Sequence, residues 1–145
     1  MSPALFSRER LIRFSDCDPA AIVFYPQYFV MFNGLVEDWF NEGLQVGYQR
    51  TIIERRIGLP IVKLEADFKA ISKMGEQVIL ALNVERLGSR SLTLQSTCTG
   101  LSDGVVRMGM RQVLVFMSLE NYQAMEIPED IHAAISHNMA AGGNT

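Results

Sequence analysis

The segment from Pro26 to about Glu42 has helical spacing of its apolar residues, and its first two turns, Tyr28 to Phe32, are apolar nearly all round; this feature constrains the fold more than any other. Pro26 is a favourable first helical residue, and Gly43 is a natural residue just after a helix end. A helix with this pattern must be covered on more than one side, so we expect the rest of the chain to curve around it. The apolar positions at helical spacing are Tyr28, Phe29, Phe32, Leu35, Val36, Trp39 and Phe40, and the polar side holds Gln27, Gly34, Glu37, Asp38 and Asn41.

Strand-like patterns flank this helix on both sides. Residues 8–14 partly alternate and predict a first strand, and four longer segments rich in Val, Ile, Leu and Thr follow the helix. These four segments span residues 60–68, 77–87, 92–100 and 105–117. Turn-like sequences separate the later segments, so we expect an antiparallel meander.

The remaining stretches carry weaker patterns. Residues 45–57 are ambiguous, and a short helix is one interpretation. Near the end of the sequence, the spacing of Ile131, Ile135 and Met139 predicts a short helix that frays from Ala140.

The predicted element order is one strand, one long buried helix and four consecutive antiparallel strands. A sheet that wraps a single helix is the hot-dog fold, an α+β architecture, and we expect residues 1–145 to form one such domain. A two-layer α+β domain with the helix on a flatter sheet would use the same elements. The apolar circumference of the helix favours wrapping.

Composition narrows the class of function. A formal net charge of −3 argues against a nucleic-acid partner, because binding a phosphate polymer requires a basic face. No apolar run reaches the roughly 20 residues that a membrane span requires. The two cysteines, Cys17 and Cys98, and the lack of a signal-peptide pattern predict a reduced, cytoplasmic protein, and no disulfide is predicted.

One loop directly before the helix holds a carboxylate near a helix N-terminus. Asp18 is followed by Pro19, which disfavours helical backbone at Asp18 and stiffens the loop. The backbone N–H groups around Tyr25 and Gln27 are expected to be unpaired donors at the positive end of the helix dipole. A fixed carboxylate and a helix N-terminus suffice to attack a carbonyl and to stabilise the oxyanion that results.

Other candidate residues are weaker. Asp16 is interpreted as a loop residue that hydrogen-bonds the backbone, although two aspartates so close in sequence could also raise a pKa. Cys17 lacks a neighbouring His or basic residue that would lower its pKa, and Glu37 is a fallback base on the helix. His132 and His137 both lie near the end of the sequence, and no serine lies in a Gly-x-Ser-x-Gly motif, so we expect no Ser-His-Asp triad. No Cys/His cluster has the spacing of metal ligands, and we expect neither a metal nor another cofactor.

The stretch from Phe14 to Tyr28, FSDCDPAAIVFYPQY, closely resembles the signature of the 4-hydroxybenzoyl-CoA thioesterase family of hot-dog proteins. The family pattern is Gly-Asp-x-Asp-Pro-Ala-Gly-Ile/Val-Val-x-Tyr-x-x-Tyr. Weaker similarity continues through Glu54-Arg55 and residues 58–62. The pair Arg90-Ser91 resembles the basic-Ser pair that enters the next strand in the family.

The resemblance implies roles for several residues. It implies that Asp18 is the catalytic carboxylate, either as nucleophile or as general base on water, and that the Tyr25 amide polarises the thioester carbonyl. It also implies that Arg90, with Ser91, binds the phosphates of coenzyme A. Tyr28, together with Phe29 and Trp39, is interpreted either as lining an acyl pocket or as part of the core.

The sequence also departs from the family pattern at three places. Ser15 and Ala21 replace two glycines, which bears on the geometry of the loop. Gly88 stands where a basic residue is expected, which bears on the contacts to coenzyme A.

The sequence therefore predicts a hydrolase, an acyl-CoA thioesterase, whose substrate carries an aromatic acyl group such as hydroxybenzoyl or a short acyl chain. The sequence leaves open the acyl group and whether the thioester is one of coenzyme A or of an acyl carrier protein. The alternatives are a non-catalytic acyl-CoA or acyl-carrier-protein binding protein and a hot-dog hydratase or dehydratase. Because an edge strand and apolar side chains need a partner, and hot-dog proteins usually pair, we expect a homodimer or homotetramer.

Overall fold

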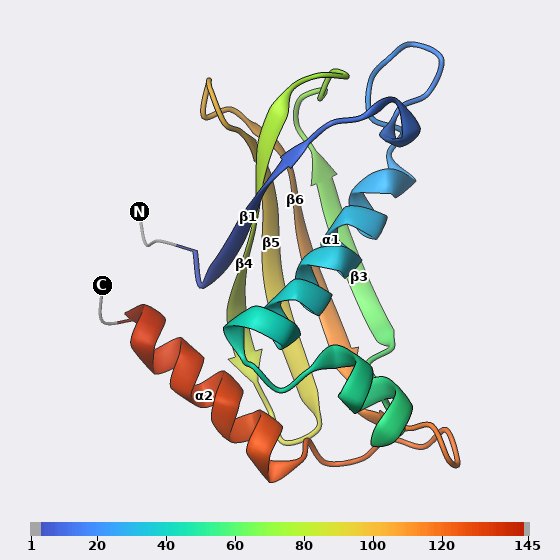
Figure 1. Cartoon of the computed structure of the whole chain (residues 1–145), viewed down its shortest axis with the longest axis vertical. Coiled ribbons are helices and arrows are strands. Elements are labelled where there is room, and N and C mark those ends of the chain that lie inside the picture. Colours follow the sequence, from blue (N-terminus) through green and yellow to red (C-terminus); the bar gives the residue numbers. More distant parts are fainter. Residues whose placement is uncertain (1–3, 144–145) are drawn as a thin grey trace.

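The computed structural model describes residues 4–143, which form a five-stranded antiparallel sheet, a two-stranded ribbon and two α-helices, with short 3₁₀ and π-helical turns. Figure 1 shows α1 lying across one face of the sheet, with α2 beside the sheet. The strands are β1 (Phe6–Leu11), β2 (Ile57–Gly58), β3 (Ile61–Phe68), β4 (Gln77–Leu87), β5 (Ser91–Gly100), β6 (Val106–Val115) and β7 (Met117–Ser118), and the helices are α1 (Pro26–Asp38) and α2 (Glu129–Gly143).

The position of β3 corrects the predicted meander. β4, β5 and β6 pair in sequence order, but β3 pairs with β6 and β1 pairs with β4, so the sheet order is β1-β4-β5-β6-β3. The connection from β3 to β4 crosses the end of the sheet instead of making a hairpin. There it bonds to the loop before α1: the Val23 amide donates to the Ser72 carbonyl (2.9 Å) and the Met74 amide to the Ala21 carbonyl (3.0 Å). Alternation in a sequence identifies strands and faces, not neighbours, so this crossing was not predictable.

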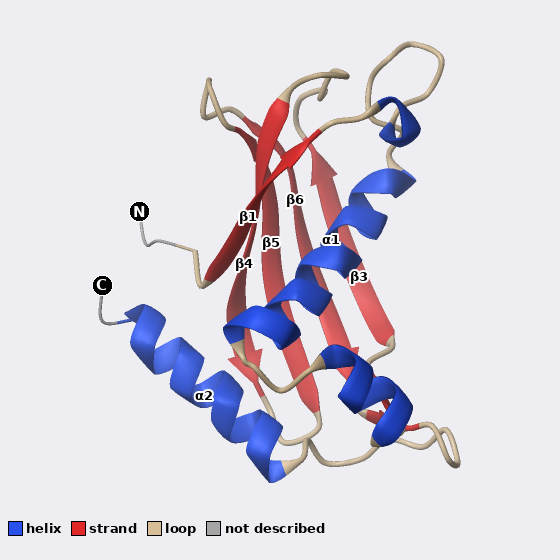
Figure 2. Cartoon of the chain, viewed as in Figure 1, coloured by secondary structure: helices blue, strands red, loops and turns tan. Residues whose placement is uncertain are grey.

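One side of α1 packs against the inner face of the sheet, and the opposite side stays uncovered (Figure 2). Tyr28, Phe32 and Leu35 are buried on the covered side. They meet a layer of sheet residues that includes Leu80, Leu82, Leu94, Cys98, Met108 and Met110. Burial of one such side chain stabilises the fold by about 1.5–3 kcal/mol, so this layer fixes α1 on the sheet. The predicted wrapping is therefore partial, because Val30 remains 59% exposed.

The ends of the predicted elements differ from the observed ones for local reasons. The first strand ends at Leu11, and Phe14–Asp16 form a 3₁₀ turn because the Asp16 carboxylate accepts a hydrogen bond from the Arg13 amide at 2.8 Å. The long helix ends as predicted near Gly43, but its last turn, Trp39–Gly43, is π-helical. The ambiguous segment contains a π-helical turn, Arg50–Glu54.

α2 packs beside β4 and the π-helical turn that follows α1. Ile131 and Ile135 are buried, and Trp39 Nε1 donates a hydrogen bond to Asn138 Oδ1 at 2.8 Å. The helix continues to Gly143, so the predicted fraying from Ala140 is wrong as far as residue 143, and residues 144–145 lie outside the described part of the chain. None of the helices formed by residues 4–143 is long and apolar enough to cross a bilayer.

Candidate active site

The loop between the 3₁₀ turn and α1 is closed by backbone hydrogen bonds. The Asp18 amide donates to the Ile22 carbonyl (3.0 Å), and the Ala21 amide donates back to the Asp18 carbonyl (2.9 Å). Cys17 and Val23 form an isolated antiparallel bridge. The two legs of the loop are thus held side by side, and Asp18 has a fixed position between them.

The Asp18 carboxylate has one engaged oxygen and one free oxygen. Its Oδ1 accepts a hydrogen bond from the Ala20 amide at 2.9 Å, which is the Asx-type turn expected of an Asp-Pro sequence. Its Oδ2 has no hydrogen bond or ion pair to any residue between 4 and 143. Since the side chain is only half-buried, this second oxygen is available to water or to a bound molecule.

Ala21 has left-handed backbone, with φ of 63°. This is one of the two positions where the resembled family has glycine, and the structure supplies the physical reason. A left-handed conformation costs an L-residue about 1–2 kcal/mol, whereas glycine adopts it freely.

Ala21→Gly is expected to raise the free energy of unfolding by about 0.5–1 kcal/mol, because relief of this strain exceeds the added flexibility of the unfolded chain. Urea unfolding followed by circular dichroism measures the change. The matched control is Ala20→Gly, at a neighbouring residue whose φ is not positive, which is expected to lower the free energy of unfolding by a similar amount. Equal destabilisation by both glycines would contradict the left-handed conformation.

Tyr25 precedes the first helical residue of α1, and its backbone N–H is a free donor. The neighbouring amides are occupied: the Phe24 amide donates to the Asp16 carbonyl (3.0 Å) and the Gln27 amide to the Phe24 carbonyl (2.8 Å). Pro26 has no N–H, and no acceptor for the Tyr25 amide occurs within residues 4–143. The N-terminal end of α1 adds partial positive charge at this point, so the amide suits an anionic oxygen.

Asp16 has a structural role in the same loop. Its carboxylate is buried and accepts two hydrogen bonds from the Arg10 guanidinium, at 2.9 and 3.1 Å, as well as the bond from the Arg13 amide. Burial alone would raise the pKa of Asp16, but the hydrogen bonds from Arg10 and Arg13 hold it below its ordinary value. This arrangement agrees with the interpretation of Asp16 as a residue that hydrogen-bonds the backbone.

Cys17 is unsuited to nucleophilic attack. Burial, followed by the neighbouring carboxylates of Asp16 and Asp18, raises the pKa of its thiol. The sulfur donates a hydrogen bond to the Arg13 carbonyl at 3.4 Å. A thiol with a raised pKa is protonated at neutral pH and therefore weakly nucleophilic.

Tyr28 lies in the core below the loop. The side chain is 4% exposed, and its hydroxyl is 2.8 Å from the Ser72 Oγ. Phe68, at the end of β3, is contacted by the rings of Tyr25, Tyr28 and Phe29. The predicted contact of Tyr28 with substrate stays a prediction, and in this structure its hydroxyl is already paired.

Arg90 and Ser91 lie in and after the turn between β4 and β5, at the opposite end of the sheet from the Asp18 loop (Figure 1). β4 alone has 11 residues and spans about 35 Å. The Arg90 side chain is exposed and makes no ion pair within residues 4–143. A single chain therefore brings Asp18 and Tyr25 together but keeps Arg90 and Ser91 away from them.

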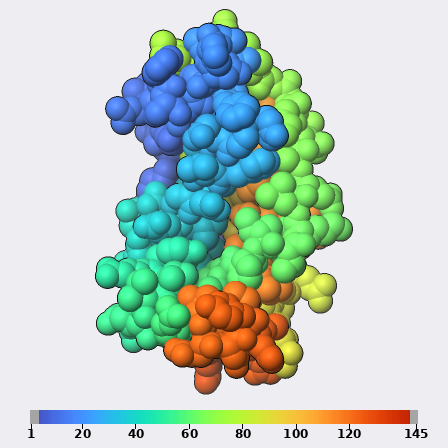
Figure 3. Space-filling model, turned by 90° about the vertical axis from the view of Figure 1, so that its right-hand side faces the viewer, coloured from blue at the N-terminus to red at the C-terminus, as the bar shows by residue number. Residues whose placement is uncertain are grey.

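A cavity of about 590 Å³ lies beside α1, on the flank that faces β3. Figure 3 shows this face, with α1 in blue and cyan on one side, β3 in green on the other, and the orange β6 visible between them. The lining residues are Val30, Asn33, Gly34, Val36, Glu37, Tyr48, Leu59, Ile61, Gln112 and Leu114. Glu37, the fallback base, therefore belongs to this cavity, about three helical turns beyond the Asp18 loop.

Sequence reasoning missed the polar residues of this cavity. Gln112 occupies an inward position on β6, where Met108, Met110 and Leu114 also point inward. A single amide in this alternating apolar series was the available signal. Asn33 and Tyr48 carried no comparable signal, because both resemble ordinary surface residues in the sequence.

Comparisons with known proteins identify the family and the fold. Residues 12–135 match a family described as the thioesterase-like superfamily. A curated relative, the 4-hydroxybenzoyl-CoA thioesterase of Pseudomonas sp. (strain CBS-3), is 25% identical over 128 residues, which are 84% of this chain and 91% of the relative.

Solved structures with similar folds include a 1,4-dihydroxy-2-naphthoyl-CoA thioesterase from Synechocystis, with a TM-score of 0.82, 20% identity and coverage of 90% of this chain and 95% of that one. A gentisyl-coenzyme A thioesterase superposes with a TM-score of 0.77, 24% identity and coverage of 86% and 98%. A 4-hydroxybenzoyl CoA thioesterase mutant in complex with 4-hydroxybenzoyl CoA superposes with a TM-score of 0.80, 23% identity and coverage of 89% and 96%.

These similarities confirm the predicted hot-dog fold and the predicted family. At the level of the family, they also confirm the prediction that this is a thioesterase. Since the family match covers residues 12–135, from just after β1 into α2, the chain belongs to the thioesterase-like superfamily.

Proposed function

We propose that this protein hydrolyses an acyl-CoA thioester to the free acid and coenzyme A, with Asp18 as the reacting carboxylate and the Tyr25 amide as the oxyanion donor. One observation carries the proposal: a free carboxylate oxygen and a free amide occur on the two bonded legs of the same loop, at the N-terminus of α1. Attack on a carbonyl requires a nucleophile or base and a donor that stabilises the oxyanion, and these two groups can supply both.

Two routes use these groups. In the first, Asp18 accepts a proton from water as the water oxygen attacks the carbonyl carbon; the carbon–sulfur bond then breaks, and the coenzyme A thiolate takes up that proton and leaves as the thiol. In the second, an Asp18 oxygen attacks the carbonyl carbon, coenzyme A leaves as a thiolate that takes up a proton, and water then hydrolyses the mixed anhydride. Both routes develop negative charge on the carbonyl oxygen, which the Tyr25 amide stabilises.

The names of the relatives favour an aromatic acyl group. Three of them are thioesterases of hydroxybenzoyl-, gentisyl- and dihydroxynaphthoyl-CoA, all of which carry hydroxylated aromatic acyl groups. The alternative of a hot-dog hydratase is disfavoured, because His132 and His137 lie on α2, which is remote from the Asp18 loop (Figure 1).

We further propose that two copies pair through β3 to complete the site. β3 is an edge strand, and its exposed residues include Val62 at 60% and Phe68 at 52%. An edge strand with free backbone groups and exposed apolar side chains is a ready pairing surface. In a two-fold dimer, the same patch meets itself, so the strands would pair antiparallel.

Antiparallel pairing would bring the partner's Arg90 to the same end of the joined sheet as Asp18. The start of the partner's β3 would lie beside the end of this chain's β3, which is at the Asp18 end of the sheet. Ser91 on β5 pairs with Val115 on β6, and the Val115 amide donates to the Pro60 carbonyl just before β3. In each copy, Arg90 therefore lies about two strand spacings, or about 10 Å, from the β3 edge of its own sheet. The proposed site therefore takes its carboxylate from one copy and its phosphate contact from the other.

A panel of CoA thioesters tests the proposed activity. We expect measurable release of free thiol from at least one of benzoyl-, hydroxybenzoyl-, phenylacetyl- or graded fatty acyl-CoA, and loss of that release in Asp18→Asn. Tight binding of acyl-CoA without turnover by the wild type would favour the non-catalytic binding protein. A panel without hydrolysis or binding would contradict both functions.

A further inference from the structure

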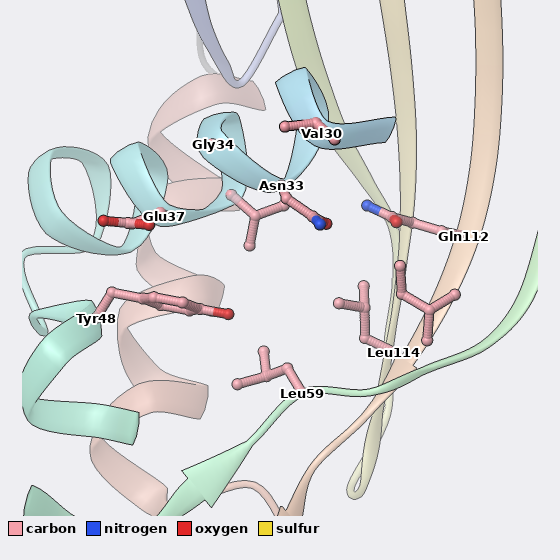
Figure 4. Close-up of a pocket in the computed structure, with 10 residues that line it drawn as sticks. Val30, Asn33, Gly34, Glu37, Tyr48, Leu59, Gln112 and Leu114 are labelled. Atoms are coloured by element: carbon pink, nitrogen blue, oxygen red, sulfur yellow. The ribbon is translucent and has the colours of Figure 1, made fainter. Parts of the chain in front are cut away.

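The cavity beside α1 combines apolar walls with a polar layer formed by the amides of Asn33 and Gln112. Val30 and Leu59, with Ile61 and Leu114, supply apolar surface. Figure 4 shows the amides of Asn33 and Gln112 pointing toward each other across the cavity, and the Tyr48 hydroxyl pointing into it. An elongated apolar group with a polar end would match this distribution.

Gln112 makes the polar layer energetically significant. Its side chain is 2% exposed, and its Oε1 is buried without a hydrogen-bond partner among residues 4–143. A buried, unpaired carbonyl oxygen lowers the stability of a fold, so such groups are normally paired with protein, water or ligand. The nitrogen of the same amide points into the cavity (Figure 4), so the cavity is where a partner for the Gln112 amide can enter.

Asn33 and Tyr48 add hydrogen-bonding groups to the cavity, Asn33 in the polar layer and Tyr48 farther from Gln112 (Figure 4). Burial, with a smaller contribution from the Glu37 carboxylate, raises the pKa of Tyr48, so its hydroxyl stays protonated and able to donate. Asn33 is exposed on α1 and offers both a donor and an acceptor. A ligand hydroxyl at this layer would therefore find a donor in the Gln112 amide nitrogen and further partners beside it.

The cavity is reached along α1 from the proposed reaction centre. Val30, its first lining residue, is four positions after Pro26, and Asn33 is eight positions after Tyr25. At 1.5 Å per residue, Asn33 lies about 12 Å along the helix axis from the Tyr25 amide. The thioester carbonyl oxygen would lie one hydrogen-bond length, about 3 Å, from the Tyr25 amide on the side of the cavity. A hydroxyl bound at the polar layer is therefore about 9 Å from that carbonyl. A benzoyl ring is too short for this distance, whereas a phenylpropenoyl group spans it.

We propose that this cavity is the acyl pocket and that Gln112 is its specificity-determining residue, which selects an extended apolar acyl group with a hydroxyl at the far end, such as a 4-hydroxycinnamoyl group. The proposal rests on the proposed thioesterase function and adds the acyl group and the residue that recognises it. Because the cavity opens beside β3, a copy paired along that strand would stand at its opening and restrict the access of water (Figure 3).

The expected selectivity follows from the unpaired amide. A site that hydrogen-bonds a substrate hydroxyl rejects the analogue without it strongly, because the buried polar group is then left unpaired. We expect kcat/KM for 4-hydroxycinnamoyl-CoA to exceed that for cinnamoyl-CoA by at least about 30-fold. For the shorter pair, 4-hydroxybenzoyl-CoA and benzoyl-CoA, the ratio is expected to be below about fivefold, because that hydroxyl does not reach Gln112.

Gln112→Met provides the central test, since it preserves the length of the side chain and removes the amide. The ratio for the cinnamoyl pair is expected to fall to within about threefold of one, while cinnamoyl-CoA is still hydrolysed. The melting temperature is expected to rise by about 3 to 8 °C, because an unpaired buried amide has been replaced by an apolar group. Leu114→Met is the matched control in the same cavity, and it is expected to leave the ratio unchanged.

Asn33→Leu gives a second variant at an exposed position, where folding is not at risk. It is expected to lower the same ratio by about threefold or more. An unchanged ratio in Gln112→Met, with thioesters still hydrolysed, would overturn the proposal and leave the proposed function intact. Absence of hydrolysis of every thioester by the wild type would instead overturn the proposed function. In that case, an unchanged or lower melting temperature of Gln112→Met would also overturn the assignment of Gln112.

Discussion

Asp18→Asn is expected to lower kcat by at least about 100-fold while the fold and substrate binding are preserved. The substitution removes the charge that attacks the carbonyl or deprotonates water. It retains an Oδ1 atom that can accept the hydrogen bond from the Ala20 amide, so the loop keeps its closure. The Tyr25 amide is also unaffected, and KM is expected to change by less than about threefold. Free-thiol release and thermal unfolding, measured on the same preparation, give both quantities.

Asp16→Asn is the matched control, because it makes the same chemical change two residues away. It removes the charge from the carboxylate that accepts two hydrogen bonds from Arg10, so we expect the free energy of unfolding to fall by about 2 kcal/mol. The folded protein is expected to retain most of its kcat. Asp18→Asn should therefore affect turnover and spare stability, and Asp16→Asn should do the reverse.

The pH dependence of stability gives a second test of the role of Asp16. The pKa of Asp16 is lower in the folded protein than its ordinary value, so the unfolded chain binds a proton more readily at this residue. The stabilisation is complete above the unfolded pKa, near 4, and is lost as the pH falls through the lower folded pKa. Asp16→Asn is accordingly expected to flatten the loss of stability below about pH 4.

For the first prediction, the contradicting outcome is that Asp18→Asn retains most of its kcat, which would show that the Asp18 carboxylate is structural.

A hybrid dimer of one Asp18→Asn chain and one Arg90→Glu chain is expected to recover about half of the wild-type activity. In the proposed arrangement, one of its two sites combines an intact Asp18 with the partner's intact Arg90. The other site carries both substitutions and is inactive. Each variant alone is expected to be impaired, by at least about 100-fold in kcat for Asp18→Asn and about tenfold in kcat/KM for Arg90→Glu.

The hybrid can be isolated by giving the two chains different affinity tags and purifying on both in turn. If Asp18 and Arg90 of the same chain formed a site, the hybrid would contain only impaired sites and show about 5% of wild-type activity at low substrate. Arg50→Glu is the control for a general effect of charge reversal, because Arg50 begins an exposed π-helical turn and has no ion pair within residues 4–143. A fully active monomer in light scattering at micromolar concentration would contradict the dimer itself.

The sequence determined the parts of the protein that depend on neighbouring residues. The apolar spacing after Pro26 predicted α1, and alternation predicted β4 with its observed bounds, because both patterns are set by local backbone geometry. Asp18, Pro19 and Tyr25 were identified for a similar reason. A stiff loop followed by a helix N-terminus is encoded within about ten consecutive residues.

Only the tertiary structure decided which distant segments meet. It placed β3 beside β6, and it separated Arg90 from Asp18 by the length of the sheet, because the connection between β3 and β4 crosses the end of the sheet against the Asp18 loop. It also turned one amide of an alternating strand, Gln112, into an unpaired group facing a cavity beside α1. Periodicity fixes the face on which a side chain lies, but the space and the partners that the side chain finds there depend on how the helix packs on the sheet.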